Sequence, residues 1–295
     1  MALSLVDVAK NKNNPVREKS YWNTYHCQSK VTSANGLLYG KYCKNRFCTL
    51  CLSIRKADII NRYLPVIQTW ESPHFTTLTI KACSKRNLNK MIDGMIRAFK
   101  RIKNNQRKRH QRGTGIEIIG VKSLECNFNP KTKTYNPHFH FIVPNKETAD
   151  LLTAEWLKIW TPKFTNKLAQ FTRPVRDTNL DLIEIIKYGS KIFTEPDVKQ
   201  KSKLRGNAFI YASALDNILE AMKGHRIFER FGFNLAKSEK QIANNIQLVT
   251  EYQNWTYNAS VSDWVNDEQD EVLSGYYAPE ELIQMLEFQV DFILE

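Results

Sequence analysis

Hydrophobic residues follow two different periods along this chain of 295 residues. Polar and apolar side chains alternate in residues 74–80, 116–128 and 137–143, which is the period of a strand. Apolar residues recur every three or four positions in residues 55–70, 87–108, 146–160, 181–193 and 214–222, which predicts helices. A further helix is expected near the C-terminus, at 279–294. The pattern therefore predicts a protein that contains both helices and strands.

Proline and glycine residues refine these elements. The turn-forming sequence Asn129-Pro130-Lys131 separates the second and third predicted strands, so these two are expected to form an antiparallel pair. Gly120 is a position where the second strand can break. Pro65 is expected to kink or split the helix at 55–70, because proline removes a backbone hydrogen bond.

The charge of the chain is unevenly distributed. The formal net charge is +13, from 43 Lys and Arg against 30 Asp and Glu. Residues 241–295 hold 11 of the acidic residues and no Lys or Arg, so residues 1–240 carry a net charge of +24. A strongly basic body favours a polyanionic partner, and nucleic acid is the commonest.

No apolar run reaches the roughly 18 residues that a membrane helix needs. The N-terminus also lacks the basic start and apolar block of a secretory signal, so a cytoplasmic protein is expected. We predict a flexible arm at 1–20, a Cys-rich segment and helix at 21–70, a DNA-binding domain at 71–240 and an acidic tail at 241–295.

Four of the six cysteines fall within 25 residues, with the spacing C-x15-C-x4-C-x2-C. In a reducing compartment, clustered cysteines indicate a metal site rather than disulfides. Four thiolates complete a tetrahedral structural zinc site and leave no position open for catalysis. The predicted ligands are Cys27, Cys43, Cys48 and Cys51, with His26 as an alternative.

The stretch Asn136–Val143 carries two imidazoles, His138 and His140, on one face of a predicted strand. A third ligand is expected from the neighbouring strand, where Glu125 is the first choice and Glu117 the second. Two imidazoles and one carboxylate leave coordination positions open, which suits Mg²⁺ or Mn²⁺ acting on a phosphate oxygen.

A second group lies on the helix predicted at 181–193. Glu184, Tyr188 and Lys191 are spaced to share one face. A tyrosine hydroxyl there can act as a nucleophile, and Glu184 can act as a general base. Lys187 and Lys191 can bind a phosphate. The alternative is a tyrosine in the core beside solvated charges.

Residues 97–112 contain eight Lys or Arg and no acid. They predict either a solvated helix face or one that binds phosphates, and Arg101, Lys108 and Arg109 are the candidates for such contacts.

These stretches resemble the ordered motifs of rolling-circle plasmid replication initiators, within the His-hydrophobic-His nucleases. The matching segments are FTTLTI, SLEC, NPHFHFIV and EIIKYGSK, with KYCKNRFCTLC before them and MKGHRIFERFGF after them. The resemblance covers roughly residues 40–235. It implies an α+β fold in which a central antiparallel sheet, ferredoxin-like or RRM-like, carries the metal ligands between flanking helices, with a zinc-binding segment at the N-terminus.

The resemblance also implies a metal-dependent, strand-specific DNA nickase. Tyr188 corresponds to the nucleophile that forms a 5′-phosphotyrosine link at the plasmid origin, and Glu184 to the residue that activates water in the terminating cleavage. His138, His140 and Glu125 correspond to the metal ligands. The freed 3′-OH primes synthesis by a host polymerase, with a host helicase as partner because the chain lacks a helicase phosphate loop.

Two other functions stay open. Single-tyrosine transposases share the order of histidines and tyrosine, although they are usually shorter. A zinc-containing DNA-binding regulator without enzymatic activity would account for the cysteines, but it would leave the histidine strand and Tyr188 without a role. The acidic tail has no counterpart in the resembling family.

Overall fold

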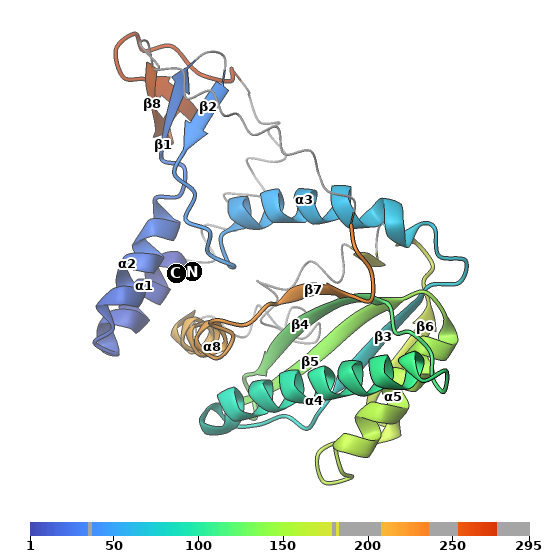
Figure 1. The fold of residues 1–295 in the computed structure, drawn as a ribbon. Helices are drawn as coiled ribbons and strands as arrows, with labels where there is room; N and C mark the ends of the chain where they lie inside the picture. The colour runs from blue at the N-terminus through green and yellow to red at the C-terminus, as the bar shows by residue number, and fades with distance from the viewer. Residues whose placement is uncertain (35–36, 179–180, 183–207, 236–252, 276–295) are drawn as a thin grey trace. The chain divides into compact units, whose positions relative to one another are not determined.

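The computed structural model describes residues 1–34, 37–178, 181–182, 208–235 and 253–275, which form an α+β structure with two antiparallel sheets (Figure 1). The described residues divide into two compact units. The first contains residues 1–52, 208–212 and 253–275, and the second contains residues 53–178, 181–182 and 213–235. Within the described ranges, every helix is too short or too polar to cross a membrane.

The second unit is built on a five-stranded sheet with the order β6-β3-β5-β4-β7, in which all neighbours are antiparallel. Its two central strands are the pair expected from the sequence, and Gly120 begins β4 rather than breaking it. The strands are β3 (His74–Thr79), β4 (Gly120–Asn129), β5 (Thr134–Val143), β6 (Phe171–Pro174) and β7 (Phe228–Phe231). The last two were not predicted, because each has only four residues.

One face of this sheet is covered by α4 (Lys85–Gln111) and α5 (Lys146–Ile159) (Figure 1). Phe139 and Phe141 of β5 point to this face, where both contact the ring of Phe99 in α4. The ring of Trp156 in α5 lies 5.9 Å from Phe139. Burying each such side chain stabilises the fold by about 1.5–3 kcal/mol. The amphipathic stripe seen in the sequence is therefore the surface that covers the sheet.

The other face is partly covered by α3 (Thr49–Ile67). Three residues of this helix, Ile59, Tyr63 and Ile67, form a buried cluster with Phe75, Val121, Ile142 and Leu182. The helix continues through Pro65 to Ile67, so the expected split is wrong. A proline so close to the end of a helix removes one hydrogen bond from the last turn only.

The first unit starts with two helices, α1 (Ala2–Asn11) and α2 (Pro15–Tyr25). The expectation of a flexible arm at 1–20 is therefore wrong. Leu5, Val6, Val8 and Ala9 are buried in α1, and the side chain of Asn14 accepts a hydrogen bond from the backbone N–H of Arg17 to cap α2. The segment was read as an arm because it is polar and contains several lysines. Its few apolar residues are nevertheless enough to form one buried helix face.

A four-stranded sheet completes the first unit, with the order β2-β1-β8-β9. Trp255 is buried in it, and its Nε1 donates a hydrogen bond to Ser33 Oγ at 2.8 Å. The strands are β1 (Lys30–Ala34), β2 (Leu37–Gly40), β8 (Gln253–Asn258) and β9 (Asp263–Asn266). Because β8 pairs with β1, part of the predicted acidic tail is joined to the Cys-rich segment, contrary to the expected division.

The remaining helices agree in part with the sequence pattern. The helix predicted at 214–222 is α8 (Ala208–Ala221), which begins six residues earlier. Asp181 and Leu182 are helical, and the rest of the helix predicted at 181–193 lies outside the described residues. The helix predicted at 279–294 also lies outside them.

Candidate metal centres

The two histidines of β5 and one glutamate of β4 meet on the sheet face opposite to α4. Glu125 pairs directly with His138 across the two strands. Glu125 Oε2 lies 3.1 Å from His138 Nε2 and 2.8 Å from His140 Nε2. One carboxylate oxygen and two imidazole nitrogens therefore converge on one point, as three ligands of one metal ion would.

Hydrogen bonds on the far side of each ring fix its orientation. His138 Nδ1 lies 3.0 Å from the carbonyl oxygen of Asn136, and His140 Nδ1 lies 2.8 Å from Thr77 Oγ1. A carbonyl oxygen only accepts, so His138 donates its Nδ1–H to it, and in the neutral ring the other nitrogen, Nε2, is the one that can bind a metal ion. Ligating histidines are typically held in this way, so the donors present fit a metal cation.

The carboxylate of Glu125 is held in its ionised form. Burial raises its pKa, but the hydrogen bonds and charges of His138 and His140 outweigh burial and lower the pKa to about 2. Glu125 and His138 are buried, and the side chain of His140 is 13% exposed. Three protein ligands leave coordination positions free, and the exposed edge of His140 lets a ligand approach.

The alternative ligand, Glu117, lies elsewhere. It is exposed in the loop before β4 and does not belong to the cluster of ligand atoms. Glu117 was an alternative ligand because it is an even number of residues from Glu125, so on one continuous strand both side chains would point to the same face. The strand begins only at Gly120, so that parity does not extend to residue 117.

Four predicted site residues, Glu184, Lys187, Tyr188 and Lys191, lie outside the described residues. The residues just before them are anchored on the sheet face that carries His138 and His140. Arg173 of β6 forms an ion pair with Asp181, and its guanidinium lies 4.9 Å from the ring centroid of Phe75. The same Phe75 ring lies 5.3 Å from the imidazole of His140. Leu182 belongs to the core cluster on this face.

The predicted phosphate-binding residues of α4 lie far from this centre, because α4 covers the opposite face. Arg101 and Lys108 are exposed. Arg109 lies 3.4 Å from Glu155 of α5, so its charge is partly used within the protein. These three side chains can contact DNA only away from the histidines.

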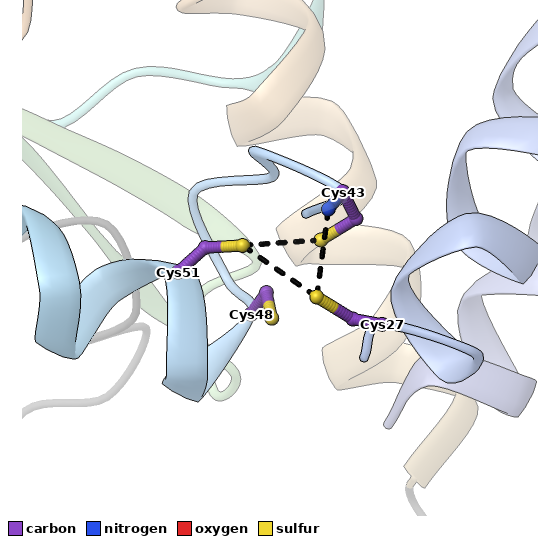
Figure 2. A group of neighbouring side chains, drawn as sticks. All are labelled: Cys27, Cys43, Cys48 and Cys51. Atoms are coloured by element: carbon purple, nitrogen blue, oxygen red, sulfur yellow. Dashed lines mark hydrogen bonds between the residues drawn. The ribbon is translucent and has the colours of Figure 1, made fainter. Parts of the chain in front are cut away.

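The second centre is formed by the four cysteines of the first unit, shown in Figure 2. Cys27 follows α2, Cys43 lies in the loop after β2, and Cys48 and Cys51 lie at the start of α3. Cys51 Sγ lies 3.6 Å from both Cys27 Sγ and Cys43 Sγ. Zinc bonds of about 2.3 Å place tetrahedral sulfur atoms about 3.8 Å apart, so this spacing fits a zinc ion.

The thiols influence one another strongly. Burial, together with contacts from the neighbouring thiols, raises the pKa of Cys27 and of Cys48. The pKa of Cys43 is lowered, because hydrogen bonds such as that from the Asn45 backbone outweigh burial. Four thiolates at these distances need a bound cation to balance their charge. His26 is exposed beside Trp22 and is not part of the cluster.

Some contributors to these centres were not found from the sequence. Thr77 was seen only as part of a strand, and its bond to His140 depends on the register of β3 against β5. Asn45 holds the cysteine loop by donating a hydrogen bond from Nδ2 to the Ser20 carbonyl at 2.8 Å. Neither Thr77 nor Asn45 stands at a spacing from the ligands that would mark it in the sequence as part of a metal site.

The fold and the first centre define a class of protein: an α+β protein with two histidines and a glutamate, a candidate metal-ligand set, on a central antiparallel sheet. A family model described as "Replication protein" matches residues 35–273. The chain belongs to this replication protein family, which confirms the resemblance to rolling-circle plasmid replication initiators.

Curated relatives agree with this assignment. The chain is 32% identical over 165 residues to "Protein rep" of Staphylococcus aureus, covering 50% of this chain and 69% of the relative. It is 24% identical over 217 residues to "Protein rep" of Bacillus amyloliquefaciens, covering 63% and 61%. A third "Protein rep", from Bacillus sp, is 23% identical over 134 residues, covering 42% of each chain. The chain thus spans less than two thirds of both Bacillus relatives. No solved structure gives a significant match.

Proposed function

We propose that this protein initiates rolling-circle replication of a plasmid by nicking one strand at the origin through a phosphotyrosine link. The observation that carries the proposal is the convergence of Glu125, His138 and His140 on one face of the sheet. Family membership supports the same reading. A divalent ion held there, Mg²⁺ or Mn²⁺, would polarise the scissile phosphate.

Tyr188 is the proposed nucleophile. It lies six residues after Leu182, so an extended chain can carry it about 20 Å from Leu182 and a helix about 9 Å. Leu182 packs with Phe75, whose ring touches His140, which supports placing the hydroxyl at the metal-bearing face. The hydroxyl oxygen would bond to phosphorus, the bond to the 3′ oxygen would break, and the 5′ phosphate would stay on Tyr188. Lys187 and Lys191 would bind the phosphate.

The freed 3′-OH would prime a host polymerase, and a host helicase would unwind the duplex. Glu184 would take a proton from water in the terminating cleavage, so that water rather than a second tyrosine attacks phosphorus. The four cysteines would bind one structural zinc ion. Origin DNA and these host proteins imply action in the cytoplasm.

Incubation with origin-bearing supercoiled plasmid and Mn²⁺ tests the proposal. We expect nicked plasmid with protein attached to its 5′ end, and mass spectrometry should locate the adduct on Tyr188. Tyr188→Phe should bind the origin without nicking it. If Tyr188→Phe nicks normally, the nucleophile assignment is wrong. Origin binding without any nicking would favour a non-enzymatic regulator, and joining of the cut end to unrelated DNA would favour a transposase.

A further inference from the structure

A groove of about 810 Å³ runs along the outer edge of β7 in the second unit. It is bordered by the C-terminal half of α4, the loop before β4, the segment after β7, and Tyr63 of α3. Among the described strands, β7 has a neighbour on one side only, which is β4. The groove therefore lies at a sheet edge that the described part of the chain leaves unpaired.

Basic side chains reach the groove from two elements. Lys103, Arg107 and His110 are spaced at i, i+4 and i+7, so they share one face of α4. Arg230 lies in β7, and Arg226 lies two residues before the start of that strand. These positions, on separate elements, line the same cavity and favour a ligand with several negative charges.

The groove also contains two acids, and one of them is already neutralised. Glu229 lies 3.2 Å from Lys122, a buried lysine of β4 that pairs with it across the two strands. Glu117 is exposed at the rim. Lys103, Arg107, Arg226 and Arg230 thus outweigh the remaining acid, and the groove is net basic.

Aromatic rings lie beside these cations. Tyr63 contacts Phe228 and Phe233, with ring centroids 5.0 and 6.5 Å apart. Phe228 and Phe233 are only half-buried, so part of each ring faces the groove. Cationic side chains that follow a backbone, combined with aromatic rings that stack on bases, are the features that bind single-stranded nucleic acid.

The groove is close to the metal centre across the sheet. Phe228 pairs with Ser123 on β4, and Ser123 pairs with His140 on β5, so all three share one face. Two strand spacings separate Phe228 from His140, which is about 10 Å. Ser123 Oγ is buried between them without a hydrogen-bond partner among the described residues. The register therefore places the groove and the metal centre on the same face of the sheet, about 10 Å apart.

Gly232 holds the groove wall in place. Its φ is +76°, and a Cβ there would lie 2.3 Å from the carbonyl oxygen of Ile118. A side chain at this position would push the segment after β7 away from the loop before β4. The sequence block MKGHRIFERFGF, which contains Phe228, Arg230 and Gly232, thus builds one wall of the groove.

We propose that this groove binds the single-stranded DNA that flanks the scissile phosphate on one side, with Lys103, Arg107 and Arg226 contacting its phosphates and Phe233 stacking on a base. The proposal rests on the proposed nicking function. We choose a single strand over a duplex because stacking on half-buried aromatic rings requires unpaired bases.

The test measures binding rather than cleavage, so its result is separate from that of the nicking assay. Full-length Tyr188→Phe protein is titrated by fluorescence anisotropy with oligonucleotides that contain the nick site alone, or the nick site extended on the 5′ or the 3′ side. The groove variant adds Lys103→Ala, Arg107→Ala and Arg226→Ala. The control variant instead adds Lys90→Ala, Lys131→Ala and Lys163→Ala, which removes the same charge from exposed positions outside the groove.

We expect extension on one side to strengthen binding in the control but not in the groove variant. Loss of three phosphate contacts should weaken binding of that extended oligonucleotide by about ten- to a hundredfold at about 0.1 M salt, and lower the slope of log K against log salt by about 2. Phe233→Leu should weaken binding of the extended oligonucleotide about fivefold or more, without changing the slope of log K against log salt.

The proposal is overturned if the groove variant keeps the gain from extension, or if the control loses it equally. Loss of binding to duplex origin DNA alone would also overturn it, and would assign the groove to duplex. Equal thermal melting temperatures of the variants establish that all are folded.

Discussion

Thr77 and His140 pair directly across β3 and β5, and Thr77 Oγ1 lies 2.8 Å from His140 Nδ1. The hydroxyl therefore supports a ring whose other nitrogen points at Glu125. Such supporting bonds typically change metal affinity by about 10- to 100-fold. The relationship makes Thr77 a positioning residue for the proposed metal centre.

Thr77→Val removes this hydroxyl while keeping the shape of the side chain. We expect the affinity for Mn²⁺, measured by calorimetry, to fall about 10- to 100-fold, because the imidazole loses its fixed orientation. Nicking at saturating Mn²⁺ should largely recover. Thr172→Val is the matched control, since the Thr172 hydroxyl donates to Thr76 Oγ1 on the opposite sheet face. Equal losses in both variants would contradict a specific role for Thr77.

Glu125 should make the metal-free protein sensitive to acid. Its pKa is about 2 in the folded protein, below the ordinary value of 4.5, because the two histidines favour the carboxylate despite burial. A lowered pKa stabilises the fold above about pH 4.5, and this stability is lost as the pH falls toward 2. The linked free energy is about 3 kcal/mol at most.

Urea denaturation in EDTA between pH 6 and 2 checks this dependence, with about 3 kcal/mol as the largest expected change. Glu125→Gln should show a flatter decline of the unfolding free energy over that range than the unsubstituted protein. Parallel declines in the two proteins would show that Glu125 does not contribute.

The sequence predicted the parts of the fold that depend on local periodicity. The long stripes of α4 and α5 and the alternation in β3, β4 and β5 marked these elements, and the parity of His138 and His140 marked their shared face. The contribution of Thr77 depends on strand register, which no local pattern determines.

Long-range pairing accounts for most of what the sequence did not reveal. Strands β7 and β8 are short, and each is stabilised by a partner far along the chain: Phe228 lies opposite Ser123, and Trp255 lies opposite Val31. The acidic composition after residue 241 predicted a separate tail, yet β8 joins the sheet of the first unit with a single buried side chain, Trp255.

Removal of one cysteine ligand should release the proposed zinc ion. For Cys43→Ser we expect less than one zinc per chain by elemental analysis, and lower stability of the first unit, because metal binding and folding are coupled. Cys83→Ser is the control, since Cys83 is buried outside the cluster. An unchanged zinc content in Cys43→Ser would rule out a four-cysteine site.

Glu184 should matter only after the first cleavage. With Glu184→Ala we expect normal nicking and normal formation of the Tyr188 adduct, since the tyrosine is the nucleophile in that step. Release of circular single-stranded product should fall, because no carboxylate accepts the proton of the attacking water. Glu184→Gln should behave like Glu184→Ala. Normal product release in both variants would remove the proposed role.

The buried Lys122 and its partner Glu229 should respond unequally to substitution. The side chain of Lys122 is 3% exposed and that of Glu229 is 23% exposed, at an Nζ–Oε1 distance of 3.2 Å. Glu229→Gln leaves an ammonium group buried without its countercharge, which typically costs about 3–5 kcal/mol. Lys122→Met keeps the packing against Phe99 and Phe139 and leaves a carboxylate that water can reach, so it should cost less than about 2 kcal/mol.

The pH dependence of the Glu229→Gln variant separates charge from packing. Burial lowers the pKa of Lys122, and the charge of Glu229 partly raises it again, so loss of Glu229 should lower this pKa further. A lowered lysine pKa means that the unfolded chain binds more protons, so the unfolding free energy should rise from about pH 7 to about pH 9.5. Urea denaturation at the two pH values measures this recovery. If Glu229→Gln is equally unstable at both, the loss comes from packing and not from the uncompensated charge.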